Sequence, residues 1–166
     1  QYISAELAKH GWSTMSQSLV RDTPLGKKTF VNLIARFQTE KLENLEDLKA
    51  INTKGILGAH LDSKMIPGIP DFLGADDAAS ACALIIELAA ELGKNHPELA
   101  KQLEIVFFDG EEAFGENITP ADGLYGSRAY AFTLYDRTPK PQFGIVLDMI
   151  GHQDLKIAVP SDTDRK

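Results

Sequence analysis

Two adjacent glutamates, Glu111 and Glu112, follow the apolar run Leu103–Phe108, separated from it only by Asp109 and Gly110. Unpaired carboxylates are costly away from water, so a buried pair needs a cation or protons. A zinc ion would bind one carboxylate directly, and the unligated neighbour could shuttle a proton. Taken alone, the pair fits a solvated loop better. It indicates a site only if other ligands gather beside it.

A histidine and an aspartate, His60 and Asp62, stand at the end of an earlier apolar run, 55–60. In an extended segment, residues two apart share one face, which lets Asp62 orient the imidazole of His60 from behind a metal. A single histidine at a strand end is more often hydrogen-bonded than metal-bound. The nearby Asp62 shifts that balance towards a ligand.

Further acids stand at the ends of other elements. Asp76 and Asp77 open a helical stretch, and Asp148 follows the apolar run 143–147. Alone, the first two fit helix N-caps, and the third fits an acid held by loop amides. Open α/β sheets, however, bind ligands beyond the carboxyl ends of their strands, and all of these groups fall at that edge. Their convergence predicts a zinc site with a carboxylate base.

The elements that must position these groups change character along the chain. From residue 54 onwards, short apolar runs alternate with helical stretches, which is typical of an α/β domain with buried parallel strands. Before that, two alternating stretches across a Pro-Gly turn predict a hairpin, and the charged stretch 40–50 predicts a surface helix or loop. The expected strands are 18–23, 28–37, 55–60, 103–108, 143–147 and 155–159, and the expected helices are 2–12, 77–92 (closed by Gly93) and 124–135.

The composition is that of one ordinary globular domain: 166 residues, 43% hydrophobic and 25% charged. A net charge of −7 without a Lys/Arg stripe argues against nucleic acid as a partner. No apolar stretch reaches the roughly twenty residues that a membrane span needs. The sequence leaves the oligomeric state open.

The single cysteine, Cys82, excludes an internal disulfide and is expected to be a buried small side chain. The sequence begins with Gln1 rather than methionine, and a removed export signal is one ordinary cause. We therefore expect an exported protein, periplasmic or secreted, with a cytoplasmic location as the alternative.

Five segments form an ordered set: HLDS at 60–63, GADD at 74–77, FFDGEEAF at 107–114, LYGSR at 124–128 and VLDMIG at 146–151. The set resembles the zinc aminopeptidase and glutaminyl cyclase superfamily, and the third and fourth segments resemble its glutaminyl-cyclase-like branch. The resemblance implies a zinc-exopeptidase-like α/β fold of three layers, with a central mixed, mostly parallel sheet and helices on both faces. It also implies that residues 1–166 form a single domain that is the N-terminal portion of a longer one.

The same resemblance implies a role for each group. Asp77, Glu112 and His60 would bind Zn²⁺. Glu111 would be the catalytic general base and acid, and Asp148 would support it in the cyclases. In the two-metal aminopeptidases, the acid matching Asp148 binds metal, as does the histidine matching His60.

Three further features follow from the resemblance. The peptide bond between Asp77 and Ala78 is expected to be cis, as in related sites. The family's last histidine ligand would lie beyond Lys166. Secreted animal cyclases carry a cysteine at the position of Ala59, which pairs with the position of Cys82, so its absence here points to a bacterial-type relative.

Three functions stay open. The leading hypothesis is a zinc-dependent glutaminyl-peptide cyclotransferase, an acyltransferase that forms N-terminal pyroglutamate from Gln-peptides and releases ammonia. The GADD segment favours instead a two-zinc aminopeptidase, a metallopeptidase that releases N-terminal residues by hydrolysis. The third is a catalytically incomplete module that binds the N-termini of peptides. This last hypothesis rests on the family's final histidine ligand, which the chain does not contain.

Overall fold

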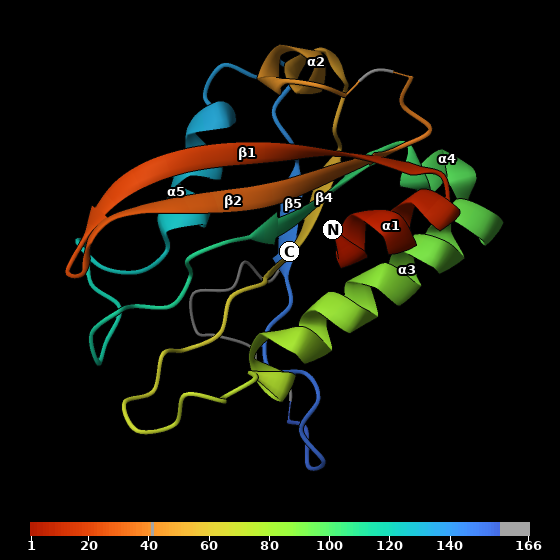
Figure 1. The fold of residues 1–166 in the computed structure, drawn as a ribbon. Coiled ribbons are helices and arrows are strands. Elements are labelled where there is room, and N and C mark those ends of the chain that lie inside the picture. Colours follow the sequence, from red (N-terminus) through yellow and green to blue (C-terminus); the bar gives the residue numbers. More distant parts are fainter. Residues whose placement is uncertain (41, 157–166) are drawn as a thin grey trace.

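The fold is known from a computed structural model, which describes residues 1–40 and 42–156. The strands are β1 Trp12–Thr23, β2 Gly26–Phe37, β3 Gly55–His60, β4 Leu103–Phe108 and β5 Phe143–Val146, and the helical elements are α1 Tyr2–Lys9, α2 Leu45–Ala50, the π-helical turn η1 Ala75–Ser80, α3 Ala81–Asn95, α4 Pro97–Ala100 and α5 Tyr125–Thr133. The strands form one five-stranded sheet in the order β1-β2-β4-β3-β5 (Figure 1). The pairs β1-β2 and β2-β4 are antiparallel, whereas β3 lies parallel to both β4 and β5.

Helices cover both faces of this sheet, so the domain has three layers (Figure 1). Successive side chains of a strand point to opposite faces. On β4, Ile105 and Phe107 pack with α1 and α3, whereas Val106 packs with α2 and α5 on the other face. The consecutive apolar residues 105–108 of β4 therefore fill both layers, as expected of a central strand that is buried on both faces. The expected α/β class with a mixed sheet is confirmed.

The N-terminal hairpin is longer than its alternating pattern predicted. β1 begins at Trp12, which pairs with Phe37, and α1 ends at Lys9 instead of reaching residue 12. The chain turns at Gly11, where a φ of +83° favours glycine. Trp12 is buried, and its indole Nε1 donates to the carbonyl of Ala89 at 3.0 Å. The predicted helix was too long because Trp12 fits helical spacing as well as an inward strand position.

The long helix α3 begins and ends later than predicted. Asp77 has non-helical backbone angles (φ −112°, ψ 91°), so regular helix begins only at Ala81. Gly93 does not end the helix, which continues to Asn95. A Cβ at Gly93 would lie 2.9 Å from the ring of Phe37, so this glycine serves close packing of α3 on β2. In the described part of the chain, no helix has both the length and the apolar character required to span a membrane.

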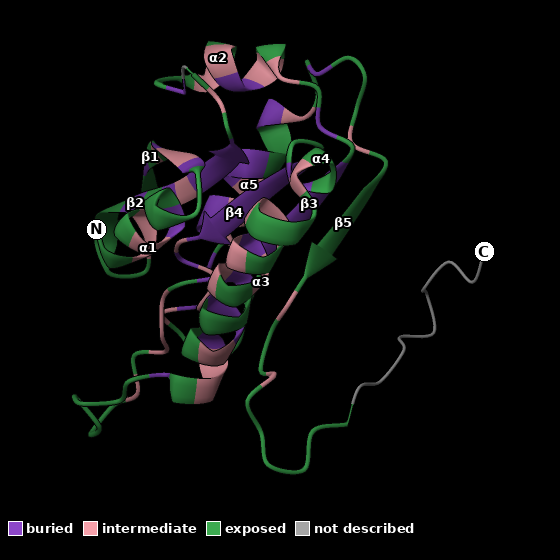
Figure 2. Ribbon diagram, turned by 90° about the vertical axis from the view of Figure 1, so that its right-hand side faces the viewer, coloured by how far each residue is buried: buried purple, intermediate pink, exposed green. Residues whose placement is uncertain are grey.

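Strand β5 forms where an apolar run predicted it, but it is not buried. Phe143, Ile145 and Val146 are 44%, 51% and 64% exposed, and Figure 2 shows β5 green at the side of the sheet. β5 is exposed because it lies at the edge of the sheet, where, among the described residues, it pairs only with β3. The strand expected at 155–159 falls largely outside the described residues, and its first two positions lie in no strand.

A buried ion network lies at the end of the sheet where β3 and β4 begin. Glu104 on β4 has no exposed surface. Its carboxylate accepts two hydrogen bonds from Arg137, at 2.8 and 3.1 Å, and one from the hydroxyl of Tyr130. Arg36 is also buried, 3.8 Å from the same carboxylate, and donates to Thr53 at 2.7 Å. The sequence analysis did not predict this network.

Candidate metal centre

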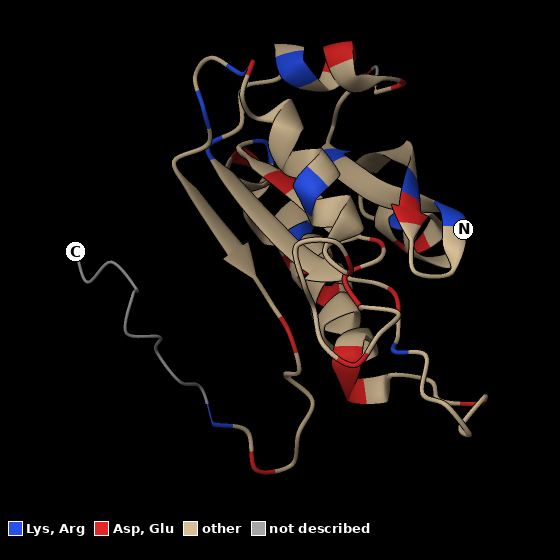
Figure 3. Ribbon diagram, turned by 90° about the vertical axis from the view of Figure 1, so that its left-hand side faces the viewer, with Lys and Arg blue, Asp and Glu red and all other residues tan. Residues whose placement is uncertain are grey.

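The predicted site residues meet at the opposite end of the sheet, beyond the carboxyl ends of β3, β4 and β5. Figure 3 shows acidic residues in the loops at this end and at the start of the helix. His60 Nε2 lies 2.7 Å from Asp77 Oδ1 and 3.4 Å from Asp148 Oδ1. One ligand atom from each of these three residues lies within 4.8 Å of the others. We call this group the ligand trio.

The imidazole of His60 is buried without a hydrogen bond to the described part of the chain. It is 3% exposed, and neither ring nitrogen makes a hydrogen bond of acceptable geometry to a described residue. Asp62 Oδ1 lies 3.6 Å from Nδ1, too far for such a bond. Burial lowers the pKa of His60, but the carboxylates of Asp62, Glu111 and Asp77 outweigh burial and raise it to about 9. A buried imidazole among carboxylates, with free ring nitrogens, fits the nitrogen and oxygen donor set of zinc.

Asp62 has two partners that the sequence analysis did not predict. Its two carboxylate oxygens accept the backbone N–H groups of Glu111 and Glu112, at 3.0 and 3.1 Å. Burial acts to raise the pKa of Asp62. His60 and these two amides have the larger, opposite effect and hold the pKa below its ordinary value, so the carboxylate stays ionised. That Asp62 also orients the imidazole of His60, whose Nδ1 lies 3.6 Å from Asp62 Oδ1, stays a prediction. Asp62 fixes the backbone of the glutamate pair.

Two further hydrogen bonds, from residues at the start of α5, hold the backbone of residues 110 and 111. The carbonyl of Gly110 accepts from Tyr125 at 2.8 Å, and the carbonyl of Glu111 accepts from Leu124 at 2.9 Å. These donors belong to the LYGSR segment that opens α5. The glutamate pair is thus held between β3 and α5, which explains why its side chains can have fixed places.

The two glutamates differ in their surroundings. Burial, together with Glu112, Asp62 and Asp148, raises the pKa of Glu111 despite the opposing effect of His60. Glu112 lies outside the ligand trio, and its Oε2 is 3.5 Å from Lys64 Nζ. Asp148 belongs to the trio, although it was predicted as the catalytic support. The metal-ligand role of Glu112 and the support role of Asp148 stay predictions.

The cis peptide bond expected between Asp77 and Ala78 is present. One other residue near the site, Lys64, had been given no role in the sequence analysis. Lys64 donates to the carbonyl of Ala113 at 2.7 Å, besides its ion pair with Glu112. Its position directly after the HLDS segment was the feature of the sequence that could have identified it as a site residue.

The family of this chain follows from a comparison with family models. The model described as peptidase family M28 matches residues 39–165. The chain belongs to this family. The M28 assignment agrees with the resemblance that the five segments carried.

Glutaminyl cyclases are among the relatives of this M28 chain. It is 37% identical over 150 residues to the glutaminyl-peptide cyclotransferase of Dictyostelium discoideum, a match over 82% of this chain and 40% of that protein. Among solved structures, the glutaminyl cyclase of Porphyromonas gingivalis matches with a TM-score of 0.71 at 27% identity, over 92% of this chain and 50% of the other. A Zn-dependent exopeptidase from Parabacteroides distasonis matches with a TM-score of 0.68 at 26% identity, over 90% and 52%. The expected fold and branch are confirmed, bacterial proteins are among the matches, and the M28 chain spans about half or less of each relative.

A loop after the glutamate pair is anchored in this M28 chain by two residues. Asp122 accepts the backbone N–H groups of Phe114 and Gly115, at 3.0 and 2.8 Å. Arg128 donates to the carbonyls of Thr119 and Pro120, at 2.9 and 2.7 Å. The loop beside the glutamates therefore has a defined shape.

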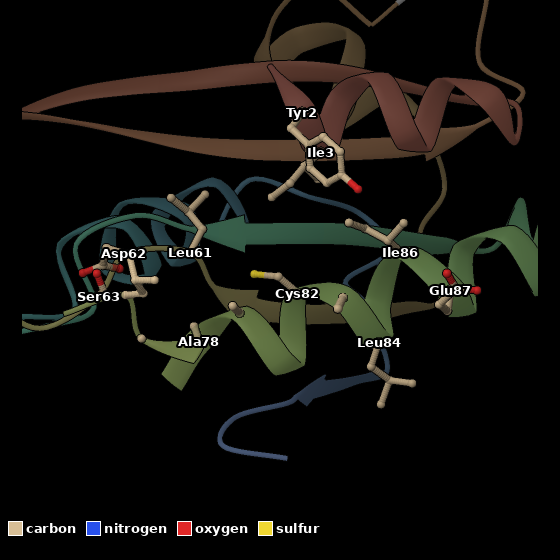
Figure 4. Close-up of a pocket in the computed structure, with 14 residues that line it drawn as sticks. Tyr2, Ile3, Leu61, Asp62, Ser63, Ala78, Cys82, Leu84, Ile86 and Glu87 are labelled. Carbon is tan, nitrogen blue, oxygen red and sulfur yellow. The ribbon is translucent and has the colours of Figure 1, made fainter. Parts of the chain in front are cut away.

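An apolar pocket of about 490 Å³ lies beside the centre, between α1 and α3 (Figure 4). Tyr2 and Ile3 line it from α1, and Cys82 and Ile86 line it from α3. Cys82 is buried and has no disulfide, as expected. The pocket reaches Asp62, but no member of the ligand trio lines it. The pocket is therefore a neighbour of the candidate metal centre.

Proposed function

We propose that this M28 chain catalyses the zinc-dependent cyclisation of N-terminal glutamine in peptides, forming pyroglutamate and releasing ammonia. The observation that carries the proposal is its 37% identity, over 82% of the chain, to a glutaminyl-peptide cyclotransferase. The acids beyond the carboxyl ends of the strands support it, since they suit a metal and a proton-transferring carboxylate. The substrate would bind through the amino end of a peptide.

The zinc would be held by His60, Asp77 and one further acid, which is Asp148 in the ligand trio and Glu112 in the ligand set that the resemblance implies. Three protein ligands with an open position are the usual arrangement of catalytic zinc. His60 supports this assignment because it is buried with both ring nitrogens free of hydrogen bonds to described residues. When bound, zinc would polarise the γ-amide carbonyl of the substrate.

Glu111 would carry the proton. The α-amine nitrogen of the substrate forms a bond to the γ-carbonyl carbon, and the γ-amide nitrogen leaves as ammonia. Glu111 takes a proton from the α-amine and returns one to the leaving nitrogen, so the carboxylate ends the cycle unchanged and no water is consumed. Its backbone is well suited to this role, because the carboxylate of Asp62 accepts the N–H of Glu111 and Leu124 donates to its carbonyl.

The decisive variant is Glu111→Gln, which keeps the shape of the side chain and removes its basicity. We expect ammonia release from a Gln-peptide to fall about 10²- to 10⁴-fold, the usual contribution of general acid–base catalysis. Zinc content, measured by elemental analysis, should stay unchanged. Glu43→Gln, at an exposed position on the far side of the domain, is the matched control. Undiminished activity of Glu111→Gln would reject the proposed role.

A second candidate is a two-zinc aminopeptidase. It is favoured by the nearness of both His60 and Asp148 to Asp77, because these are the groups that bind metal in such enzymes. The Zn-dependent exopeptidase from Parabacteroides distasonis has the same fold at 26% identity. Metal content and product separate the candidates. One zinc with ammonia from Gln-peptides supports the cyclase, two zincs with free amino acids support the peptidase, and zinc binding without turnover supports a peptide-binding module.

A further inference from the structure

Asp148 sits on a segment that the sheet holds only weakly. It follows β5, an edge strand whose side chains are exposed. The last backbone contact to the sheet is the hydrogen bond from Leu147 to the carbonyl of Gly58, at 2.8 Å. The side chain of Asp148 is 51% exposed, yet its Oδ1 lies 3.4 Å from the buried ring of His60. Another part of the structure must therefore fix its place.

That part is the turn η1. The carboxylate of Asp76 accepts the backbone N–H of Gly151 at 2.6 Å. The hydroxyl of Ser80 accepts the backbone N–H of Ile150 at 3.2 Å and itself donates to Asp76. Asp76 and Ser80 thus bind two consecutive amides just beyond Asp148. We call these two residues the η1 clamp.

The backbone of the segment fits this clamp closely. Met149, between Asp148 and the bound amides, has a φ of +47°, which turns the chain back towards η1. A Cβ at Gly151 would lie 2.8 Å from the Cβ of Ser80 and 3.1 Å from Oδ1 of Asp76. Glycine at 151 is therefore required for the approach, which gives a physical reason for the end of the VLDMIG segment.

We infer that Asp76 and Ser80 are positioning residues that set Asp148 opposite Asp77 and His60. This inference rests on the proposed function, since it assigns them to the same centre. Asp77 belongs to η1 itself, so one short element fixes two of the three members of the ligand trio. Asp76 acts as a hydrogen-bond acceptor, and it is not part of the trio. A neutral acceptor of the same shape should therefore replace it.

The test compares Asp76→Ala with Asp76→Asn, because asparagine keeps the acceptor oxygen and loses the charge. Hydrogen–deuterium exchange of the metal-free chain reports on the peptide spanning 147–152. Zinc affinity is measured by competition with a chromophoric chelator. We expect Asp76→Ala to speed exchange in that peptide and to weaken zinc binding about 10- to 100-fold, as for other groups behind metal ligands. Asp76→Asn should stay within about twofold of the unmodified chain by the same measure.

Controls separate the clamp from the metal site. Asp71→Ala, at an exposed acid in the preceding loop, should change neither readout. Ser80→Ala removes only a hydroxyl and should speed exchange at Ile150, which keeps the test available if Asp76→Ala does not fold. Unchanged exchange in both alanine variants, or an Asp76→Asn variant as weak as Asp76→Ala, would overturn the inference. If Asp77→Asn still binds zinc normally, the proposed metal site fails, while the exchange result still reports on the clamp.

Discussion

The two ends of the β3–β4 pair both carry buried charge, but they neutralise it differently. Where the strands begin, Glu104 is fully buried between Arg137 and Arg36, and the hydroxyl of Tyr130 completes its hydrogen bonds. Where the strands end, His60 is as deeply buried, but its neighbours Asp77 and Asp148 have no Lys or Arg partner among the described residues. Arginines balance the buried carboxylate at the first end, whereas at the second end the described residues place a histidine, and no lysine or arginine, beside Asp77 and Asp148.

This difference separates a structural charge from a functional one. Buried charges that are paired and hydrogen-bonded within the protein hold the fold in one arrangement. Acids gathered around a histidine whose ring nitrogens make no hydrogen bond to described residues remain available to a cation. The comparison therefore predicts a loss of stability without metal for mutations at the first end, and a loss of zinc-dependent stabilisation for mutations at the second.

The largest effect on stability is expected where β3 and β4 begin, at the ion-paired Glu104. Glu104→Gln keeps the shape of the side chain but leaves Arg36 and Arg137 buried without their counter-charge. We expect the free energy of unfolding to fall by about 3–5 kcal/mol, the usual cost of breaking a buried ion pair. Urea denaturation followed by circular dichroism measures it. A loss below about 1 kcal/mol, as for a surface pair, would remove the contrast between the two ends.

A smaller effect on stability, which depends on added zinc, is expected where β3 and β4 end, beside Asp77 and Asp148. Zinc at a hundred times its dissociation constant should stabilise the unmodified chain by about 2.7 kcal/mol. Asp77→Asn should lose most of that gain, because it removes a ligand from the trio. Denaturation with and without zinc measures the difference, and Asp71→Asn serves as control. Equal stabilisation of the Asp77 variant would show that zinc binds elsewhere.

The smallest effect is expected for Lys64→Met. Lys64 Nζ lies 3.5 Å from Glu112 Oε2, and both side chains are partly exposed, at 23% and 15%. We expect the free energy of unfolding to change by less than about 1 kcal/mol. The same denaturation measurement applies. A loss as large as that of Glu104→Gln would mean that Lys64 neutralises the acids at this end of the strands, as the arginines neutralise Glu104 at the other.

The sequence by itself determined the strands β3 and β4 and the edge at which the acids gather. The observed bounds, Gly55–His60 and Leu103–Phe108, match the predicted ones. Short, mostly apolar runs between polar residues leave little choice of where a strand begins and ends. The placement of His60, Asp77 and Asp148 at one edge followed, since the carboxyl ends of parallel strands lie together. The cis bond at Asp77 came from the resemblance alone.

Only the tertiary structure decided the partners. Asp62 binds the amides of residues 49 and 50 positions away, Asp76 binds an amide 75 positions away, and Glu104 meets Arg137 across 33 positions. Likewise, the apolar sequence of β5 predicted a buried strand, but its place at the side of the sheet left it exposed. Spacing along a strand fixes which face a side chain takes. Which distant group it meets there depends on how loops and helices pack, and the local pattern does not contain that information.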